Sequence, residues 1–451
     1  MSNTISRKKR GVVLSVFLCL CLGINAQETR KWSLEECIQH AIDHNISLKQ
    51  IELQKENAKI KLNTSQMSRL PNLNAGVDQR WSFGRAEIEN GTHAKTTSIS
   101  NTSLSVNSSI PLFTGFRITN EIARDKLDLQ AASANLEKAR ESLSLNVASL
   151  FLQVLFNKEI VKINEDQWAM SRLQIERTRK LVDAEKVPLS QLYDMEAQVA
   201  KDEVSVVQAQ NSLNLALLDL AQSLELERET SFDIFAPELN NVIEEYAGSI
   251  RPPHIIFNNV VGIRPAIKEQ EYRVESAEKT LKIAQSGYYP TLNLSLGYGT
   301  SYYYNYDFDN VSFSKQFRDK AGEYIGLNLS IPVFNRFSVR NNVRSSRINM
   351  QNQQLVLEDS KKNLYKEIQT AYSNAIAAQE KIKASGKAVK ASAESFKYAQ
   401  KKYETGKSSV FEFNEARTRM LQSQSEEIQA KYEYVFRTKI LDFYNGEAIK
   451  L

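Results

Sequence analysis

Two histidines, His40 and His44, are spaced so that they could share one face of a helix and bind a metal ion. A zinc-protease helix also needs a Glu directly after the first His, and Ala41 stands there instead. Gly297-Tyr298-Gly299 could suggest a phosphate loop, but it lies in a strand-like pattern rather than before a helix. No Ser/His/Asp or Cys/His set can be assembled. The sequence therefore predicts no enzyme, no bound metal and no cofactor.

The N-terminus has the features of a secretory signal. Four basic residues, Arg7 to Arg10, precede an apolar run from Gly11 to Ile24, and Asn25-Ala26 is a plausible cleavage site. A membrane anchor would need a longer apolar run. Removal of residues 1–26 leaves 54 of the 58 basic residues against 53 acidic ones, so nucleic-acid binding loses its electrostatic basis. Only Cys37 remains, which excludes an internal disulfide.

The longest segment without a helix breaker runs from Phe116 to Val187. It contains no Gly or Pro, which predicts one helix of roughly 100 Å, too long for a globular core. Val187-Pro188 ends this helix. A returning helix reaches about Leu226, and its apolar residues recur every seven positions from Leu192 to Leu220, as in a left-handed coiled coil.

Two stretches alternate between apolar and polar residues, which predicts strands with one apolar and one wet face. The first runs from Leu73 to Phe83, and after a loop near Asn90-Gly91 the second runs from Leu104 to Leu112. The stretch Pro111-Leu112-Phe113-Thr114-Gly115-Phe116 is expected to end this strand and to start the long helix. The polar face is almost entirely Ser, Asn, Gly and Thr, as expected beside a water-filled lumen. An ordinary antiparallel sheet with one solvated face is the alternative.

The chain then repeats itself. Residues 68–74 correspond to 287–293, Ile110-Pro111-Leu112-Phe113 corresponds to Ile331-Pro332-Val333-Phe334, and a second long helix is expected from Ser338 to Thr405. Each copy reads short helix, strand, loop, strand, long helix, turn, medium helix, and the first short helix opens with the capping-box pattern Ser33-Leu34-Glu35-Glu36 and continues to Leu70-Pro71. The predicted organisation is a signal peptide (1–26), repeat 1 (27–228), an irregular segment (229–262) and repeat 2 (263–451).

Strands with one apolar face fit a tilted transmembrane barrel. Lipid does not tolerate an open sheet edge, and about eight strands are the minimum that closes. Four strands per chain therefore predict that several chains share one barrel, which the long helices continue as a tube. The aromatic residues expected at the membrane surface are Trp81, Phe83, Tyr298, Tyr302 and Tyr304.

With these features the chain resembles the TolC-like outer membrane efflux protein family over essentially its whole mature length. The motifs that carry the resemblance are Ala41-Ile42-Asp43-His44-Asn45, Leu70-Pro71-Asn72-Leu73, Pro111-Leu112-Phe113-Thr114-Gly115, Ile263-Arg264-Pro265-Ala266-Ile267, Tyr289-Pro290-Thr291-Leu292, Pro332-Val333-Phe334 and Tyr403-Glu404-Thr405-Gly406. The resemblance implies an α+β membrane protein: a homotrimer with a 12-stranded barrel in the Gram-negative outer membrane and a periplasmic α-helical coiled-coil tube.

The function implied by the resemblance is a passive exit duct, joined through a periplasmic adaptor protein to an inner-membrane pump. A structural or adhesive envelope coiled coil without channel activity is the alternative. The cargo and the class of pump are not readable from the chain.

The resemblance also implies where the duct closes. Acidic residues of the family, more often Asp, match Glu412 and Glu415 here, which share a helix face and would form a charged ring in an oligomer. In repeat 1 the equivalent residues are Gln191 and Asp194. Tyr403 stands at the family's closure contact. Solvated carboxylates and ordinary tyrosine packing are the alternatives.

The turns between the long and medium helices resemble the adaptor-docking ends of the family. The predicted tip residues are Lys186, Val187, Pro188, Leu189, Gly406, Lys407, Ser408 and Ser409. Pro188 departs from the more usual Gly.

Overall fold

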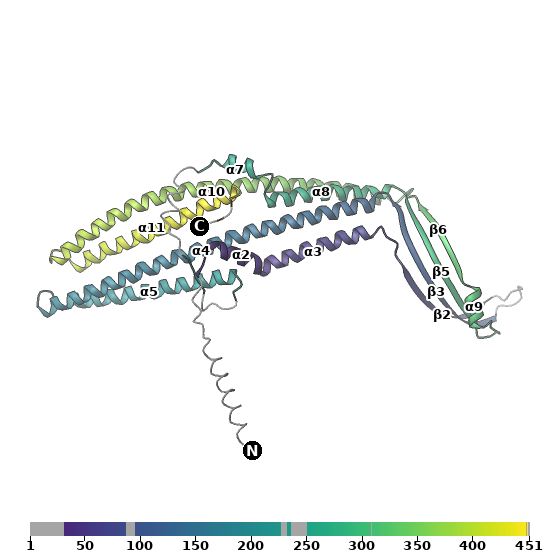
Figure 1. Cartoon of the computed structure of the whole chain (residues 1–451), viewed down its shortest axis with the longest axis horizontal. Helices are drawn as coiled ribbons and strands as arrows, with labels where there is room; N and C mark the ends of the chain where they lie inside the picture. The colour runs from purple at the N-terminus through teal and green to yellow at the C-terminus, as the bar shows by residue number, and fades with distance from the viewer. Residues whose placement is uncertain are drawn as a thin grey trace, which may run out of the picture. The chain divides into compact units, whose positions relative to one another are not determined.

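The computed structural model describes residues 31–86, 95–226, 232–235, 250–307, 309–447 and 449 (Figure 1). The predicted signal peptide lies outside them. The chain forms two compact units: unit 1 comprises Met1–Leu48, Arg140–Phe257 and Glu367–Leu451, and unit 2 comprises Lys49–Ala139 and Asn258–Lys366. Among the described helices, none is long and apolar enough to span a bilayer.

Unit 2 contains a four-stranded antiparallel sheet in the order β2-β3-β5-β6. The strands are β2 (Asn74–Ala86), β3 (Lys95–Thr114), β5 (Thr291–Asn305) and β6 (Gly322–Ser330). β3 ends at Thr114, within the stretch from Pro111 to Phe116 that the sequence predicted to end it. The ladder shifts register between Pro111 and Phe113, because a bulge accommodates a residue that cannot donate a hydrogen bond.

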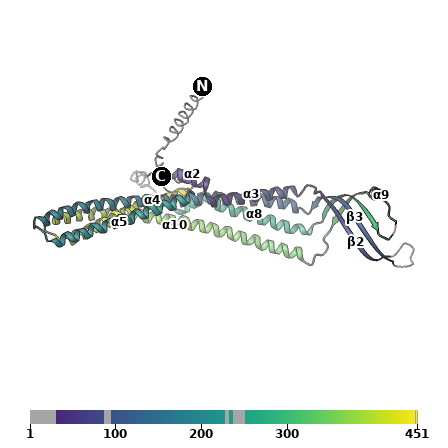
Figure 2. The ribbon, with the colours of Figure 1, turned by 90° about the horizontal axis from the view of Figure 1, so that it is seen from below.

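The helices of unit 2 follow one another in the same order as the strands (Figure 2). They are α3 (Ile46–Met67), α4 (Arg117–Asp183), α8 (Pro265–Gln285) and α10 (Ser338–Glu404). Ser65 of α3 donates to Asp125 of α4, and Ser276 of α8 donates to Asp128 of α4 at 2.5 Å. A Cβ on Gly287, just after α8, would lie 2.8 Å from Val339 of α10. The two helices at the edges of this layer are therefore α3 and α10, just as β2 and β6 are the edge strands of the sheet.

A short helix, α9 (Phe313–Asp319), covers the part of β5 that β6 does not reach. The Gln316 amide donates to the Tyr303 carbonyl at 2.9 Å and accepts from the Tyr303 N–H at 3.1 Å. A side chain thus replaces the neighbouring strand at this edge.

The first predicted helix is broken in two. Ser33 caps α2 (Leu34–His44) with the predicted capping box, in which the Glu36 N–H donates to the Ser33 hydroxyl at 3.2 Å and the Ser33 N–H donates to the Glu36 carboxylate at 3.0 Å. Asn45 leaves the helical conformation, and its side chain accepts from the Leu48 N–H at 3.1 Å. The sequence predicted continuity because Gly and Pro are absent, but an Asn that competes for backbone donors is enough to start a new helix.

Unit 1 contains two long helical hairpins. The distal part of α4 returns as α5 (Leu189–Ser223), and the distal part of α10 returns as α11 (Val410–Tyr444). α4 and α10 have 67 residues each, and α5 and α11 have 35 each. α4 ends before Pro188 because Glu185 adopts a left-handed conformation (φ 58°); Pro188 itself caps α5.

The long helices and the returning helices of the two halves stand at one sequence offset, 221 residues (338 − 117 for α4 and α10, 410 − 189 for α5 and α11). All positive-φ residues of the described chain form pairs at this offset: Gly115 with Arg336, Phe116 with Phe337, Glu185 with Gly406, and Glu225 with Gly446. A left-handed backbone costs a non-glycine residue about 1–2 kcal/mol. The two halves therefore use the same turns, even where a costly residue occupies them.

The main apolar core of unit 1 lies where α2, α4 and α5 meet. Phe151, Val154 and Leu155 of α4 pack there with Leu220 of α5 and the free Cys37 of α2. Burial, together with the nearby Glu36 carboxylate, raises the pKa of the Cys37 thiol to about 12.

The inter-repeat segment is more regular than predicted. β4 (Asp233–Ile234) pairs in parallel with β1 (Lys31–Trp32), and α7 covers Pro253–Val260. Pro253 lies in the segment that the sequence predicts to be irregular, but proline is favoured at the first position of a helix, where its missing donor is not needed. Residues 236–249 lie outside the described chain.

Candidate functional site

The two predicted tip turns have the same hydrogen-bond geometry. In the first, the Lys186 N–H donates to the Leu181 carbonyl at 2.9 Å around the left-handed Glu185. In the second, the Lys407 N–H donates to the Lys402 carbonyl at 2.8 Å around Gly406, whose φ is 71°. Both are Schellman closures. Only the second turn has the residue that this geometry favours, a glycine.

The tip presents mostly exposed side chains. Of the eight predicted tip residues, only Val187 and Ser408 are half-buried. Sequence analysis missed Phe411, which is 76% exposed at the start of α11. The sequence signal for Phe411 was its place directly after Ser408-Ser409-Val410, at the start of the predicted returning helix.

The predicted gate carboxylates are exposed and locally paired. The Glu412 carboxylate accepts from the Ser408 hydroxyl at 2.6 Å, while the Glu412 N–H donates to the capping Ser409 at 3.2 Å. Glu415 pairs with Arg419 one turn later at 3.1 Å. Asp194 is exposed in the second turn of α5. Among the described residues no hydrogen bond or ion pair joins these acids to one another, so a ring of charge needs further copies of the chain.

Tyr403 packs onto an aromatic cluster. Its ring stacks on Phe413 at 4.9 Å between centroids, and Phe413 also contacts Phe396 at 5.5 Å. This is the packing alternative considered for Tyr403, and it couples the end of α10 to the start of α11.

A buried polar network, which sequence analysis missed, joins three helices of unit 1. Arg417 of α11, 2% exposed, donates to the Asp202 carboxylate of α5. Ser171 of α4 donates to the same carboxylate, and Gln198 donates to it at 2.8 Å. The Gln167 amide oxygen accepts from the guanidinium. Burial lowers the pKa of Arg417, and the Asp202 charge opposes that shift.

The signal for this network was an interrupted row. Four buried residues follow one another at seven-residue intervals on α5: Met195, Asp202, Ala209 and Ala216. Asp202 is the one charged residue among these four. A carboxylate in a buried heptad row requires a cation from a neighbouring helix.

A second buried acid, Asp125 of α4, lies in unit 2. Burial by itself raises its pKa, but hydrogen bonds from Ser65 and Arg124 and the positive charges of Arg124 and Lys61 outweigh burial, so the pKa is lowered. Lys61 lies 3.5 Å from the carboxylate. Asp125 therefore holds α3 against α4 as an anion.

Aromatic residues gather near both ends of the sheet. Trp81, Ser100 and Tyr304 share one row, in which Trp81 and Tyr304 are exposed. Tyr302 contacts Tyr304 at 6.3 Å between ring centroids. Phe83 lies two residues after Trp81 on β2, on the same face of the sheet. Tyr298 lies in the middle of β5, away from this group.

Sequence analysis missed the aromatic residues at the helical end of the sheet. Phe113 and Phe116 lie 5.3 Å apart, Phe116 and Tyr289 6.2 Å apart, and Phe334 and Phe337 5.6 Å apart between ring centroids. The doubled Pro-x-Phe-x-x-Phe sequence was the signal.

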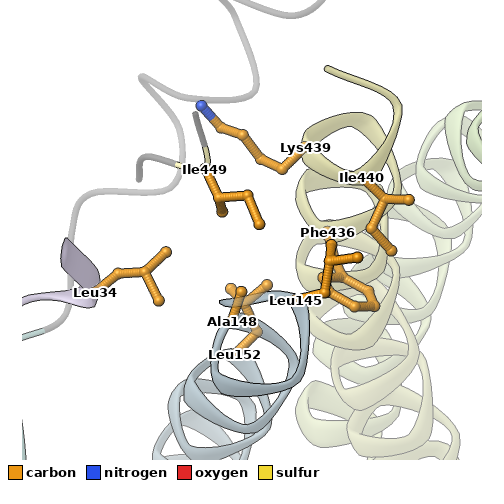
Figure 3. Close-up of a pocket in the computed structure, with 8 residues that line it drawn as sticks. All are labelled: Leu34, Leu145, Ala148, Leu152, Phe436, Lys439, Ile440 and Ile449. Atoms are coloured by element: carbon orange, nitrogen blue, oxygen red, sulfur yellow. The ribbon is translucent and has the colours of Figure 1, made fainter. Parts of the chain in front are cut away.

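A small apolar pocket of about 10 Å³, little more than the space of one water molecule, lies in unit 1 (Figure 3). It is lined by Leu34, Leu145, Ala148, Leu152, Phe436, Lys439, Ile440 and Ile449. Figure 3 shows the Lys439 ammonium directed away from the apolar side chains. Apart from Lys439 the lining is entirely apolar, and the pocket belongs to the packing of the core.

Unit 2 thus has a four-stranded antiparallel sheet with an exposed apolar face, and unit 1 has two long helical hairpins. The family model of the outer membrane efflux protein matches residues 37–225 and 258–445. The TolC outer membrane protein of Escherichia coli K12 is 22% identical over 440 residues, covering 94% of this chain and 84% of TolC.

Solved channels have the same fold. CusC superposes with a TM-score of 0.78 at 17% identity over 95% of this chain and 96% of CusC. The CmeC outer membrane channel of Campylobacter jejuni gives a TM-score of 0.75 at 14% identity over 92% and 85%.

The chain belongs to the outer membrane efflux protein family. Membership decides between the two predicted functions: the chain is an efflux exit duct of the outer membrane, and the adhesive coiled coil is not supported. The family is one of channels rather than enzymes.

Proposed function

We propose that three copies of the chain form one duct, with twelve strands in a shared barrel. The main support for this proposal is that both edge strands of the sheet lack a partner strand. β2 and β6 have no strand partner on their outer sides among the described residues, although Val77 of β2 and Leu327 of β6 are 69% and 68% exposed on one apolar face. In lipid each unpaired backbone group costs several kcal/mol, so the edges must pair with other copies.

The aromatic residues fit the thickness of a bilayer. From Tyr289 to Tyr304 the chain is extended over about 50 Å, which gives about 35 Å along the membrane normal at a 45° tilt. Aromatic belts at headgroup level are separated by this span in a bilayer with a core of about 30 Å.

The helix layer has complementary edges. Leu53, Ile60 and Met67 form a seven-residue row on α3 and are 67%, 61% and 50% exposed. Ile348 and Leu355 of α10 are 64% and 63% exposed, again seven residues apart. α3 of one copy against α10 of the next would bury both rows as a coiled-coil seam.

The equal offsets of helices and turns support an internal duplication, so a trimer presents six similar hairpins. We assign Glu412 and Glu415, with Asp194 and Tyr403, to the closure. The eight tip residues form the docking end for a periplasmic adaptor that leads to an inner-membrane pump. The duct is passive, and the pump supplies energy and selects cargo.

Two measurements test the assembly. Light scattering of the detergent-purified protein should give the mass of three chains, and planar bilayers should show ion conductance. Ile325→Lys on the apolar face should lower the trimer fraction, since a lysine facing lipid near mid-membrane costs about 2–4 kcal/mol. Asn328→Lys on the polar face is the control and should assemble. A monomer that stays soluble without detergent refutes the proposal.

A further inference from the structure

An uncompensated arginine stripe, which we define as Arg336, Arg340, Arg344 and Arg347, begins in the turn before α10 and continues through the first turns of this helix. All four side chains are exposed. No Asp or Glu occurs between Asn335 and Leu357 in the sequence. Within the described chain, no carboxylate pairs with any of the four; Arg340 instead lies over the Phe337 ring at 5.6 Å.

The equivalent part of repeat 1 is built differently. Arg117 pairs with Glu121 at 2.9 Å, and Arg124 pairs with Asp125 at 2.8 Å. At the constant offset, Glu121 and Asp125 correspond to Asn342 and Ser346. Repeat 2 has therefore lost the acids and gained three arginines at positions where repeat 1 has no basic residue.

Arg336 occupies a costly position. Its φ is 54°, and repeat 1 has Gly115 at the same turn, with φ 59°. A non-glycine residue in this conformation costs about 1–2 kcal/mol. Strain of this kind points to a role for the side chain.

The handedness of the strands decides whether the arginine stripe lies on the outer side or on the bore side of the helix layer formed by α3, α4, α8 and α10. As proposed above, the apolar face of the sheet is turned to lipid. β2 runs away from the helices. The backbone N–H of Asn72, just before β2, donates to the Ser109 carbonyl of β3. Because hydrogen-bonded pairs alternate along an antiparallel ladder, the backbone groups of the polar residues of β2 are the ones that bond to β3. For L-residues this arrangement puts β3 to the left of β2, seen from the lipid with the helices below. The whole order β2-β3-β5-β6 runs leftward.

Seen from the lipid, α10 therefore has α8 on its right, and the face of α10 that carries Val339 and Val343 is turned to α8. The chain of α10 runs away from the sheet. Seen along the helix axis from the sheet, successive side chains of a right-handed helix turn clockwise by about 100° per residue. Arg340, Arg344 and Arg347 therefore point outward. Asn342 and Ser345 point into the bore, as polar residues should.

The stripe lies at the depth of the headgroups. The exposed Val333, Phe334 and Phe337 mark the end of the apolar surface, and α10 starts at Ser338. From Arg340 to Arg347 the helix rises about 10 Å, comparable with the headgroup layer of about 5–8 Å. Across the proposed seam, the exposed Arg69 follows the end of α3, and no acid occurs between Glu56 and Arg69.

We propose that the arginine stripe binds the phosphate groups of anionic phospholipids in the periplasmic leaflet, one site per copy. This rests on the proposed trimeric barrel. Arg guanidinium groups bind phosphate oxygens in pairs, and the aromatic residues above them suit the interface. The lipid would supply the counter-charge that repeat 1 obtains from its own carboxylates, and would fix the height of the duct in the membrane.

The test uses the full trimer in vesicles of phosphatidylcholine with spin-labelled phosphatidylglycerol. The wild type should prefer phosphatidylglycerol over spin-labelled phosphatidylcholine, and sodium chloride should weaken the preference. The variant Arg336→Gly/Arg340→Gln/Arg344→Gln should lose it by at least about fivefold, the effect of one basic residue near an anionic surface. Arg336→Gly restores the residue of the equivalent turn, so this part of the variant should not harm folding.

The matched control is Lys387→Gln/Lys390→Gln/Lys397→Gln, which removes three charges from the part of the same helix that belongs to unit 1 and should keep the preference. An unchanged preference in the arginine variant, or its abolition by inorganic phosphate alone, overturns the proposal. So does altered ion selectivity without altered lipid preference, which would place the stripe in the bore. Conductance of the wild type separates the two proposals: a conducting trimer without lipid preference refutes only this one.

Discussion

Arg417 of α11 donates to Asp202 of α5 inside unit 1, so one buried ion pair joins the returning helices of the two hairpins. Every other polar group of this network is a neutral donor or acceptor from α4 or α5. The pair is therefore the electrostatic link between the two halves at this level.

Arg417→Leu should destabilise the hairpin pair strongly. It leaves Asp202 buried without a cation, at a cost of about 3–5 kcal/mol, whereas Arg417→Leu/Asp202→Leu should recover most of the loss. Amide exchange in α5 and α11 should accelerate about 10²–10³-fold in the single variant. The exposed pair Lys381–Glu433, 2.8 Å apart, gives the control: Lys381→Met should change exchange less than about fivefold. Equal effects of the two substitutions contradict this assignment.

Asp125→Asn should make the stability of unit 2 less dependent on acid. The pKa of Asp125 is lowered in the fold, so its contribution is complete above the unfolded value of about 3.9 and is lost as pH falls through the folded value. At pH 7 the variant should be less stable by about 1–2 kcal/mol. Thermal unfolding of the detergent-bound protein from pH 7 to pH 3 should show the two proteins converge; a constant gap would exclude Asp125 as the cause.

Glu412→Gln/Glu415→Gln should weaken cation preference in single-channel recordings. Gln at 412 can still accept from Ser408 and leaves the Ser409 cap intact, so the charge changes without the helix start. We expect the cation-to-anion permeability ratio to fall roughly fivefold, as for an interaction of about 1 kcal/mol. Glu394→Gln, an exposed carboxylate elsewhere on α10, should not alter it. Unchanged currents in the double variant would remove both acids from the gate.

Gly406→Pro should abolish export while the barrel still assembles. Proline fixes φ near −65°, against 71° here, and removes the N–H that donates to Tyr403 at 3.0 Å. Glu185→Gly at the equivalent turn relieves strain and should keep export. Dye accumulation in cells with the native pump reports transport, and the trimer band on gels reports assembly. Full transport by Gly406→Pro would mean that docking lies elsewhere.

The elements and their doubled order were readable from the sequence because each depends on local chemistry. Runs without Gly or Pro give long helices, strict alternation gives two-faced strands, and Ser33 with Glu36 makes a cap. The misjudged boundaries were also local: Asn45 restarts a helix, and Pro253 begins a helix within the segment that was expected to be irregular.

Only the tertiary structure decided which distant residues meet. Asp202 and Arg417 are 215 positions apart, and nothing in either helix alone requires the other, so their pairing follows from how the hairpins pack. The outward direction of the arginine stripe likewise depends on strand order and chain handedness. Local sequence sets which face of a helix is polar; packing against the neighbouring helix sets where that face points.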